Sequence, residues 1–132
     1  MRVSTEAASS VGASTGTVLD TARLKCMLGG ELGVDARSVH AFIIGEHGDS
    51  ELAVFSSANV SGIDLRDFYD MCQPDEYQND TERIYDQVKD SAYKIIESEK
   101  ATYFGVAMAV CRICECIMRN EHSILTVSGV VE

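Results

Sequence analysis

At 132 residues the chain has the size of one ordinary domain, and its 45% hydrophobic and 24% charged residues are close to soluble globular averages. This composition excludes wholesale disorder and a fibrous repeat. The 21 acidic against 11 basic residues give a formal net charge of −10, which repels nucleic-acid phosphates and anionic membrane surfaces. We therefore expect no nucleic-acid partner.

Six elements are predicted after a lead-in. Residues 1–15 are rich in Ala, Ser, Thr and Gly without a sustained apolar period, so we expect this segment to be poorly ordered. Helical spacing or β-prone composition marks the elements that follow. In chain order they are a helix over 16–32, strands over 39–44 and 52–55, helices over 80–98 and 101–118, and a strand over 123–131.

The cysteines and the apolar runs bear on the compartment. There are five cysteines, an odd number, and three of them crowd into residues 111–116, which is unlike a secreted disulfide framework. The N-terminus lacks an apolar stretch of signal-peptide length, and about 18 uncharged apolar residues never run together. We expect reduced thiols, no membrane partner and a cytoplasmic location.

The polar segment Gly45-Glu46-His47-Gly48-Asp49-Ser50 follows the first predicted strand and places a histidine between two glycines. Glycine has no Cβ, so a ligand or another backbone segment can approach closely. Histidine can take or give a proton near neutral pH, which makes His47 a candidate acid–base residue. The alternative is a polar hairpin whose His47 and Asp49 are only solvated, and the spacing does not decide between the two.

Asp20 and Arg23 are three residues apart on the first predicted helix, so their side chains share one face. An arginine fork suits a carboxylate substrate, because two parallel N–H donors match the two oxygens. The alternative is an exposed ion pair of small energetic value.

The motif Cys111-x-x-Cys114-x-Cys116 has a spacing that thiolate ligands can use, but a second ligand cluster is missing and the segment lies inside a helical apolar pattern. We therefore predict no metal site, with a metal or cluster site as the alternative. We expect Cys111 and Cys114 to be small apolar side chains of the core.

The segment Gly16-Thr17-Val18-Leu19-Asp20-Thr21-Ala22-Arg23, followed by Gly45-Glu46-His47-Gly48-Asp49-Ser50, resembles the L-lactate/L-malate dehydrogenase family. The resemblance continues through Lys100-Ala101-Thr102-Tyr103-Phe104-Gly105 and Ile124-Leu125-Thr126-Val127-Ser128, which are more similar to bacterial lactate dehydrogenases than to malate enzymes. It implies a partial C-terminal substrate domain over residues 16–132. The implied fold class is α+β (mixed α/β), with antiparallel strands packed against long helices.

The resemblance also implies roles. His47 would exchange the proton with the ketone oxygen of pyruvate or the hydroxyl of lactate, and Asp20 would orient it and stabilise its charge. Arg23 would clamp the substrate carboxylate, and Thr102 would line the substrate pocket. The hydride would come from NADH, because no protein side chain can supply it.

A regulatory site is implied by Lys25 and His40, which match positions that help form a fructose 1,6-bisphosphate site between subunits of bacterial lactate dehydrogenases. Arginine is frequent where this chain has Lys25, and lysine keeps the charge but loses the bidentate fork. Phosphate binding is then weaker or absent, and a structural role for His40 is the alternative. The family also implies a homo-oligomer.

The family's nucleotide-binding half is missing from the resemblance. No Gly-x-Gly-x-x-Gly occurs in the chain, so we expect that a Rossmann domain, with its mobile loop and second catalytic arginine, is absent. The family also continues beyond the last predicted strand. We expect a chain truncated at both ends that binds NAD mainly through the missing domain and is inactive alone. L-malate dehydrogenase and a non-catalytic subunit-contact module stay open as alternatives.

Overall fold

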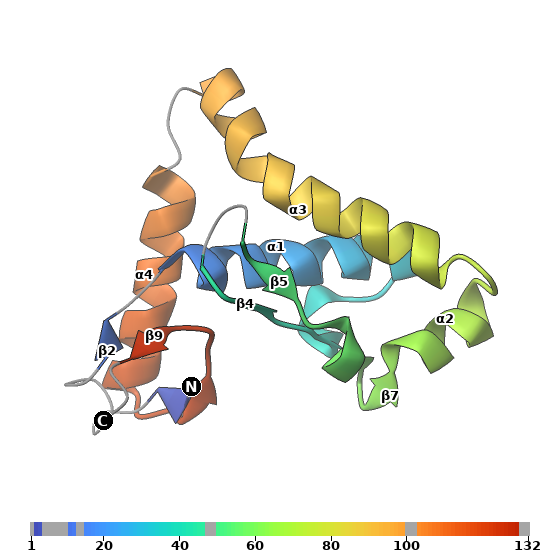
Figure 1. Ribbon diagram of the computed structural model, residues 1–132. Helices are drawn as coiled ribbons and strands as arrows, with labels where there is room; N and C mark the ends of the chain where they lie inside the picture. The colour runs from blue at the N-terminus through green and yellow to red at the C-terminus, as the bar shows by residue number, and fades with distance from the viewer. Residues whose placement is uncertain (1, 4–10, 13–14, 47–49, 100–102, 130–132) are drawn as a thin grey trace.

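The computed structural model describes residues 2–3, 11–12, 15–46, 50–99 and 103–129 (Figure 1). Its helices are α1 (Thr15–Leu32), α2 (Leu65–Cys72), α3 (Tyr77–Glu99) and α4 (Tyr103–Met118). The helices predicted over 16–32, 80–98 and 101–118 are thereby confirmed, with ends that differ by three residues or fewer. Single turns of 3-10 helix lie at Ala36–Ser38 and Phe55–Ser57.

Every strand pair in the described part of the chain is antiparallel. One sheet has the order β3-β6-β7, and the others are the pairs β4-β5, β1-β8 and β2-β9. The strand bounds are β1 Arg2–Val3, β2 Val11–Gly12, β3 Val39–His40, β4 Ile43–Ile44, β5 Leu52–Ala53, β6 Asn59–Val60, β7 Ile63–Asp64, β8 Ser123–Ile124 and β9 Ser128–Gly129. Long helices with short antiparallel strands confirm the α+β prediction.

Two predicted strands are divided in the structure. The segment predicted over 39–44 is two strands, because β3 pairs with β6 whereas β4 pairs with β5. The segment predicted over 123–131 gives β8 and β9, which pair with β1 and β2. Those two partners fall within residues 1–15, for which a poorly ordered lead-in stays a prediction.

Helix α2 was not predicted. It begins where the Asp64 carboxylate accepts a hydrogen bond from the Arg66 backbone N–H at 2.9 Å, a standard N-cap. Leu65 and Tyr69, four residues apart, are both buried on its inner face. The helix lies at the C-terminal end of α1 (Figure 1), where it covers part of the main core.

Helix α1 connects two hydrophobic clusters. Its C-terminal half contributes Leu24 and Leu28, both fully buried, to the larger cluster with β3, β4, α2 and α3. Its N-terminal turn contributes Val18 to a smaller cluster with Ala109 and Ile113 of α4. In Figure 1, α4 crosses α1 near the N-terminal end of α1. Residues 19–23 therefore lie between the two clusters, where both limit how α1 can move.

Candidate active site

Asp20 and Arg23 form an ion pair on α1, between the two hydrophobic clusters. Arg23 Nη1 lies 3.0 Å from Asp20 Oδ1, and the two side chains are only 15% and 2% exposed. The exposed ion pair considered as an alternative is therefore wrong, because both side chains are largely removed from solvent. A carboxylate buried this deeply requires charge compensation, which the guanidinium provides.

The guanidinium of Arg23 has the chemistry of an anion site. It carries five N–H donors in a planar fork, and its hydrogen bond to Asp20 Oδ1 is donated by Nη1. A carboxylate binds such a fork through two parallel hydrogen bonds. The structure thus brings an acid and a cation together on α1, as the sequence predicts.

The β4–β5 hairpin leads into the segment that contains His47. Gly45 has φ +92°, and a Cβ there would lie 3.1 Å from the carbonyl oxygen of Ser50, so this position requires glycine. At the other side of the turn Glu51 is 4% exposed, and its backbone carbonyl accepts a hydrogen bond from the Tyr85 hydroxyl on α3. The two ends of the turn are therefore fixed, one by the glycine conformation at Gly45 and the other by the hydrogen bond from Tyr85 to Glu51. His47 itself lies outside the described residues.

The remaining predicted site residues are only partly placed. Lys25 is half-buried, which lowers its pKa below the usual 10.5, and its Nζ lies 6.0 Å from the centroid of the Phe42 ring. His40 is exposed on β3, opposite Asn59 of β6. Thr102 lies outside the described residues.

Sequence reasoning missed two polar residues beside the site, the partly buried Thr21 and the buried Glu51. Thr21 accepts a hydrogen bond from the backbone N–H of Ile43, which ties α1 to β4 at 2.9 Å. The available signal was a polar side chain at an inward position of a helix, which usually has a specific partner when it is buried.

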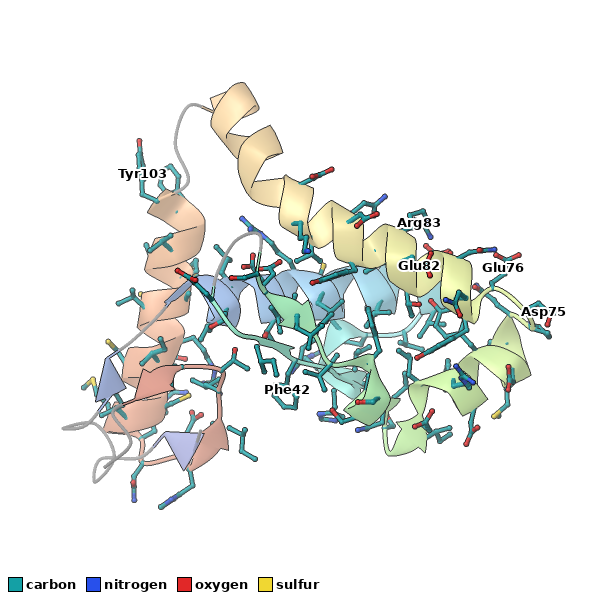
Figure 2. The ribbon with its side chains drawn as sticks, viewed as in Figure 1. Phe42, Asp75, Glu76, Glu82, Arg83 and Tyr103 are labelled. Carbon is teal, nitrogen blue, oxygen red and sulfur yellow. The ribbon has the colours of Figure 1, made fainter. Side chains whose placement is uncertain are left out.

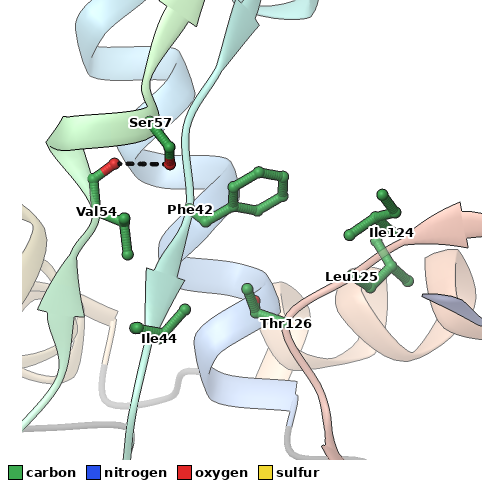
Figure 3. A pocket seen from close by; sticks show the side chains of 7 residues that line it. All are labelled: Phe42, Ile44, Val54, Ser57, Ile124, Leu125 and Thr126. Carbon is green, nitrogen blue, oxygen red and sulfur yellow. Dashed lines mark hydrogen bonds between the residues drawn. The ribbon is translucent and has the colours of Figure 1, made fainter. Parts of the chain in front are cut away.

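A pocket of about 290 Å³ also went unpredicted (Figure 3). It lies between the β4–β5 hairpin and the segment that follows β8, and no charged side chain lines it. Its lining residues are Phe42, Ile44, Val54, Ser57, Ile124, Leu125 and Thr126. An apolar pocket of this kind does not suit a carboxylate, so Arg23 remains the candidate anion site.

The cysteines correct one prediction. Cys111 and Cys114 are exposed, so their assignment to the core is wrong, and Cys116 is the buried thiol of the motif. The buried stripe of α4 follows Ala109, Ile113 and Cys116, which leaves the other two cysteines on its opposite side. All five cysteines of the chain lie in the described part and are unpaired.

The described residues contain neither a metal-ligand cluster nor a membrane-spanning helix. The side chains there form no group of three or more metal ligands. None of the described helices combines the length and the apolarity that crossing a bilayer requires.

Known proteins resemble this chain over most of its length. The L-lactate dehydrogenase of Acetivibrio thermocellus is 53% identical over 118 residues, and that of Moorella thermoacetica is 50% identical over 117. Each match covers 89% of this chain but only 37% of the relative. Two crystal structures are also similar, a lactate dehydrogenase from a Medee basin deep-sea metagenome library and the minor L-lactate dehydrogenase from Enterococcus mundtii.

The structural similarity is close. The TM-scores are 0.83 and 0.82, at 44% and 42% sequence identity, and the matches cover 89% and 91% of this chain but 37% and 38% of those chains. The family profile of the lactate/malate dehydrogenase alpha/beta C-terminal domain matches residues 17–132. The chain therefore belongs to the lactate/malate dehydrogenase family, whose alpha/beta C-terminal domain it contains.

Proposed function

We propose that this chain is the substrate-binding part of an NAD-dependent L-lactate dehydrogenase, which interconverts pyruvate and (S)-lactate. The observation that carries the proposal is the buried Asp20–Arg23 pair on α1, in a chain 53% identical to an L-lactate dehydrogenase. Two further points support it. Pyruvate is a small carboxylate that fits an arginine fork, and the hairpin next to α1 leads into a histidine.

Each residue of the proposed site has a role. Arg23 binds the substrate carboxylate and so fixes its orientation. His47 donates a proton to the ketone oxygen during reduction and removes it from the hydroxyl during oxidation. Asp20 stabilises the positive charge that the histidine carries before it donates, and Thr102 lines the pocket.

The described residues do not form a dinucleotide site. Their strand pairs are antiparallel, whereas the dinucleotide fold binds its cofactor at the ends of parallel strands, beside a glycine-rich turn. We propose that NAD, which supplies or accepts the hydride, is held mainly by residues outside this chain. We accordingly expect the 132-residue chain alone to show no pyruvate reduction.

A hybrid enzyme tests the proposal. The aligned residues of this chain replace the matching residues of the Acetivibrio thermocellus L-lactate dehydrogenase, and pyruvate reduction is followed through NADH absorbance. We expect activity, and we expect His47→Asn to lower kcat by about a hundred- to ten-thousandfold while NADH still binds, since one proton-transfer step is lost. A folded hybrid that binds NADH but does not reduce pyruvate would contradict the proposed function.

Three further parts of the proposal concern the whole enzyme. We place it in the cytoplasm, which five unpaired cysteines fit. We propose a homo-oligomer, supported by the exposed apolar side chains of α4. We also propose weak binding of fructose 1,6-bisphosphate through Lys25 and His40. Titration of the hybrid with the sugar phosphate tests this last point, and an unchanged pyruvate saturation curve would count against it.

The non-catalytic alternative has a test of its own. A subunit-contact module needs an exposed apolar surface, and α4 has one. Size-exclusion chromatography of the 132-residue chain and of the hybrid, with a pyruvate reduction assay on the hybrid, separates the two functions. Assembly of both the chain and the hybrid, without activity in the hybrid, would favour the contact module.

A further inference from the structure

Three threonine hydroxyls lie where α1, β4 and the segment after β8 meet. Thr21 Oγ1 accepts the Ile43 backbone N–H at 2.9 Å and lies 3.3 Å from Thr126 Oγ1, and either hydroxyl can donate across that contact. One helical turn earlier, Thr17 Oγ1 donates to the Thr126 backbone carbonyl at 2.7 Å. Thr17 is 3% exposed. Figure 3 shows Thr126 near Ile44 of β4, beside the apolar pocket.

The hydroxyls of Thr17 and Thr21 form hydrogen bonds outside their own helix. A buried helical threonine commonly bonds the carbonyl four residues earlier, and Thr81 of α3 does so, donating to Tyr77 at 2.7 Å. Thr17 and Thr21 bond other segments instead. Threonine is a poor helix former, so two of them on one face of α1 are better explained by these tertiary contacts than by the helix.

The backbone N–H of Ile43 needs a hydrogen-bond acceptor, and this explains why position 21 carries a hydroxyl. Strand β4 pairs with β5 along one edge, and the Ile43 N–H has its acceptor on α1, in the Thr21 hydroxyl. A buried backbone N–H left without an acceptor is strongly unfavourable. An apolar side chain at position 21 would fill the same space but leave this amide unpaired.

We propose that Thr21 is a positioning residue, whose hydroxyl fixes the face of α1 that carries Asp20 and Arg23 relative to β4. The hydrogen bond from Thr17 to Thr126 ties α1 to the segment after β8 in the same way. This inference rests on the proposed function, because β4 continues along the chain into the turn that contains His47. Catalytic groups must be held within about 0.5 Å of their working geometry. The hydroxyls of Thr17, Thr21 and Thr126, which we call the threonine junction, supply that constraint.

The first test measures catalysis in the hybrid enzyme. Thr21→Val keeps the shape of the side chain and removes the hydroxyl, so we expect kcat/KM for pyruvate to fall by roughly ten- to hundredfold. Thr21→Ser restores the hydroxyl and should recover most of the loss. Thr81→Val is the matched control, because it removes a buried hydroxyl that bonds only its own helix. It should lower the Tm but leave kcat/KM within about twofold, as expected far from the chemistry.

The second test reads the junction without catalysis. Hydrogen exchange of the Ile43 amide, measured in the hybrid, should become faster in Thr21→Val and stay protected in Thr21→Ser and Thr81→Val. If the unsubstituted hybrid is inactive, the proposed function fails while this exchange measurement still tests the junction. Normal kcat/KM in Thr21→Val, or unchanged Ile43 exchange, would overturn the inference.

A milder variant guards against misfolding. Thr126→Val removes one hydroxyl of the junction but leaves the Ile43 acceptor and the Thr126 carbonyl in place. We expect the same direction of change with a smaller loss of kcat/KM. A loss of Tm in Thr126→Val without any loss of kcat/KM would show that the junction acts on stability alone.

Discussion

Arg23 and Asp20 form an ion pair whose guanidinium and carboxylate are largely removed from solvent. We expect Arg23→Lys in the hybrid enzyme to raise the pyruvate KM by about ten- to hundredfold, since lysine cannot form the two parallel hydrogen bonds to a carboxylate. Arg37→Lys is the matched control, because Arg37 pairs with Asp35 at a position where its side chain is 91% exposed. Steady-state kinetics decides the matter, and an unchanged KM in Arg23→Lys would argue against the carboxylate clamp.

At the level of single residues, the sequence predicted the position of a side chain on its helix better than its environment. The three-residue spacing of Asp20 and Arg23 correctly placed them on one helix face. Their burial was not predictable, because the segments that pack against α1, among them α4 and β4, are distant from it in sequence. The junction at Thr21 was missed for the same reason, since its partners are 22 and 105 residues away. The roles of His47 and Thr102 stay predictions.

At the scale of the elements, α1 contains two adjacent glycines, of which Gly29 is closely packed and Gly30 has open space around it. A Cβ on Gly29 would lie 2.8 Å from the Val34 carbonyl oxygen, which is backbone and cannot move aside, whereas a Cβ on Gly30 meets nothing within 4 Å. We expect Gly29→Ala to lower the free energy of unfolding by about 1 to 3 kcal/mol through overpacking. Gly30→Ala should raise it by about 0.5 to 1 kcal/mol, because alanine favours the helix. Denaturant unfolding of both variants checks the opposite signs, and equal changes would contradict the packing seen at Gly29.

The end of α4 is joined to β8 through Glu121. Its carboxylate accepts hydrogen bonds from Arg112 at 2.8 and 3.3 Å, from Ser123 at 3.0 Å and from the Cys116 thiol at 3.4 Å. The Arg112 bond is the main cause that lowers the pKa of Glu121 from its usual 4.5 to about 2. Folding therefore gains stability from this carboxylate above about pH 4.5, and the gain is lost as the pH falls from there towards 2.

Glu121→Gln tests that pH dependence. Above pH 5 we expect the variant to have a lower Tm than the parent chain, and the difference should shrink as the pH falls through the range in which Glu121 takes up its proton. Glu76→Gln, at an exposed position before α3, is the control. Thermal unfolding followed by circular dichroism at several pH values gives the answer, and a Tm difference that does not vary with pH would refute the assignment.

Helix and strand boundaries show where local patterns stop being informative. The three long helices have sustained apolar spacing and were predicted. Helix α2 has only eight residues, and its one buried pair, Leu65 and Tyr69, is too short a pattern among charged residues to indicate a helix. The division between β3 and β4 could not be predicted, because both strands are β-prone and differ only in which distant strand each pairs with. Local sequence determines whether a segment extends, and the tertiary fold determines its partner.

Over the whole molecule, the exposed apolar side chains gather on α4. Phe104, Met108 and Met118 are 72%, 71% and 85% exposed, and Tyr103 points away from the rest of the structure (Figure 2). Exposed apolar side chains that cluster on one helix favour an interaction surface. We expect the 132-residue chain to self-associate with rising concentration and Met108→Glu to weaken the association.

The control for that prediction is Met71→Glu. Met71 lies on α2 and is 70% exposed, so the same charge is introduced at equal exposure but on a different helix. Sedimentation velocity over a range of concentrations measures both variants. Equal weakening by the two substitutions would show that α4 is not the contact surface.

The hydrogen bonds from α1 to Thr126 span 109 and 105 residues of sequence. Contacts of such long range form late in folding, because the entropy of closing the intervening loop must first be overcome. During synthesis, α1 and β4 emerge from the ribosome long before Thr126 does. The face of α1 that carries Asp20 and Arg23 can therefore reach its final geometry only after almost the whole described chain has been made.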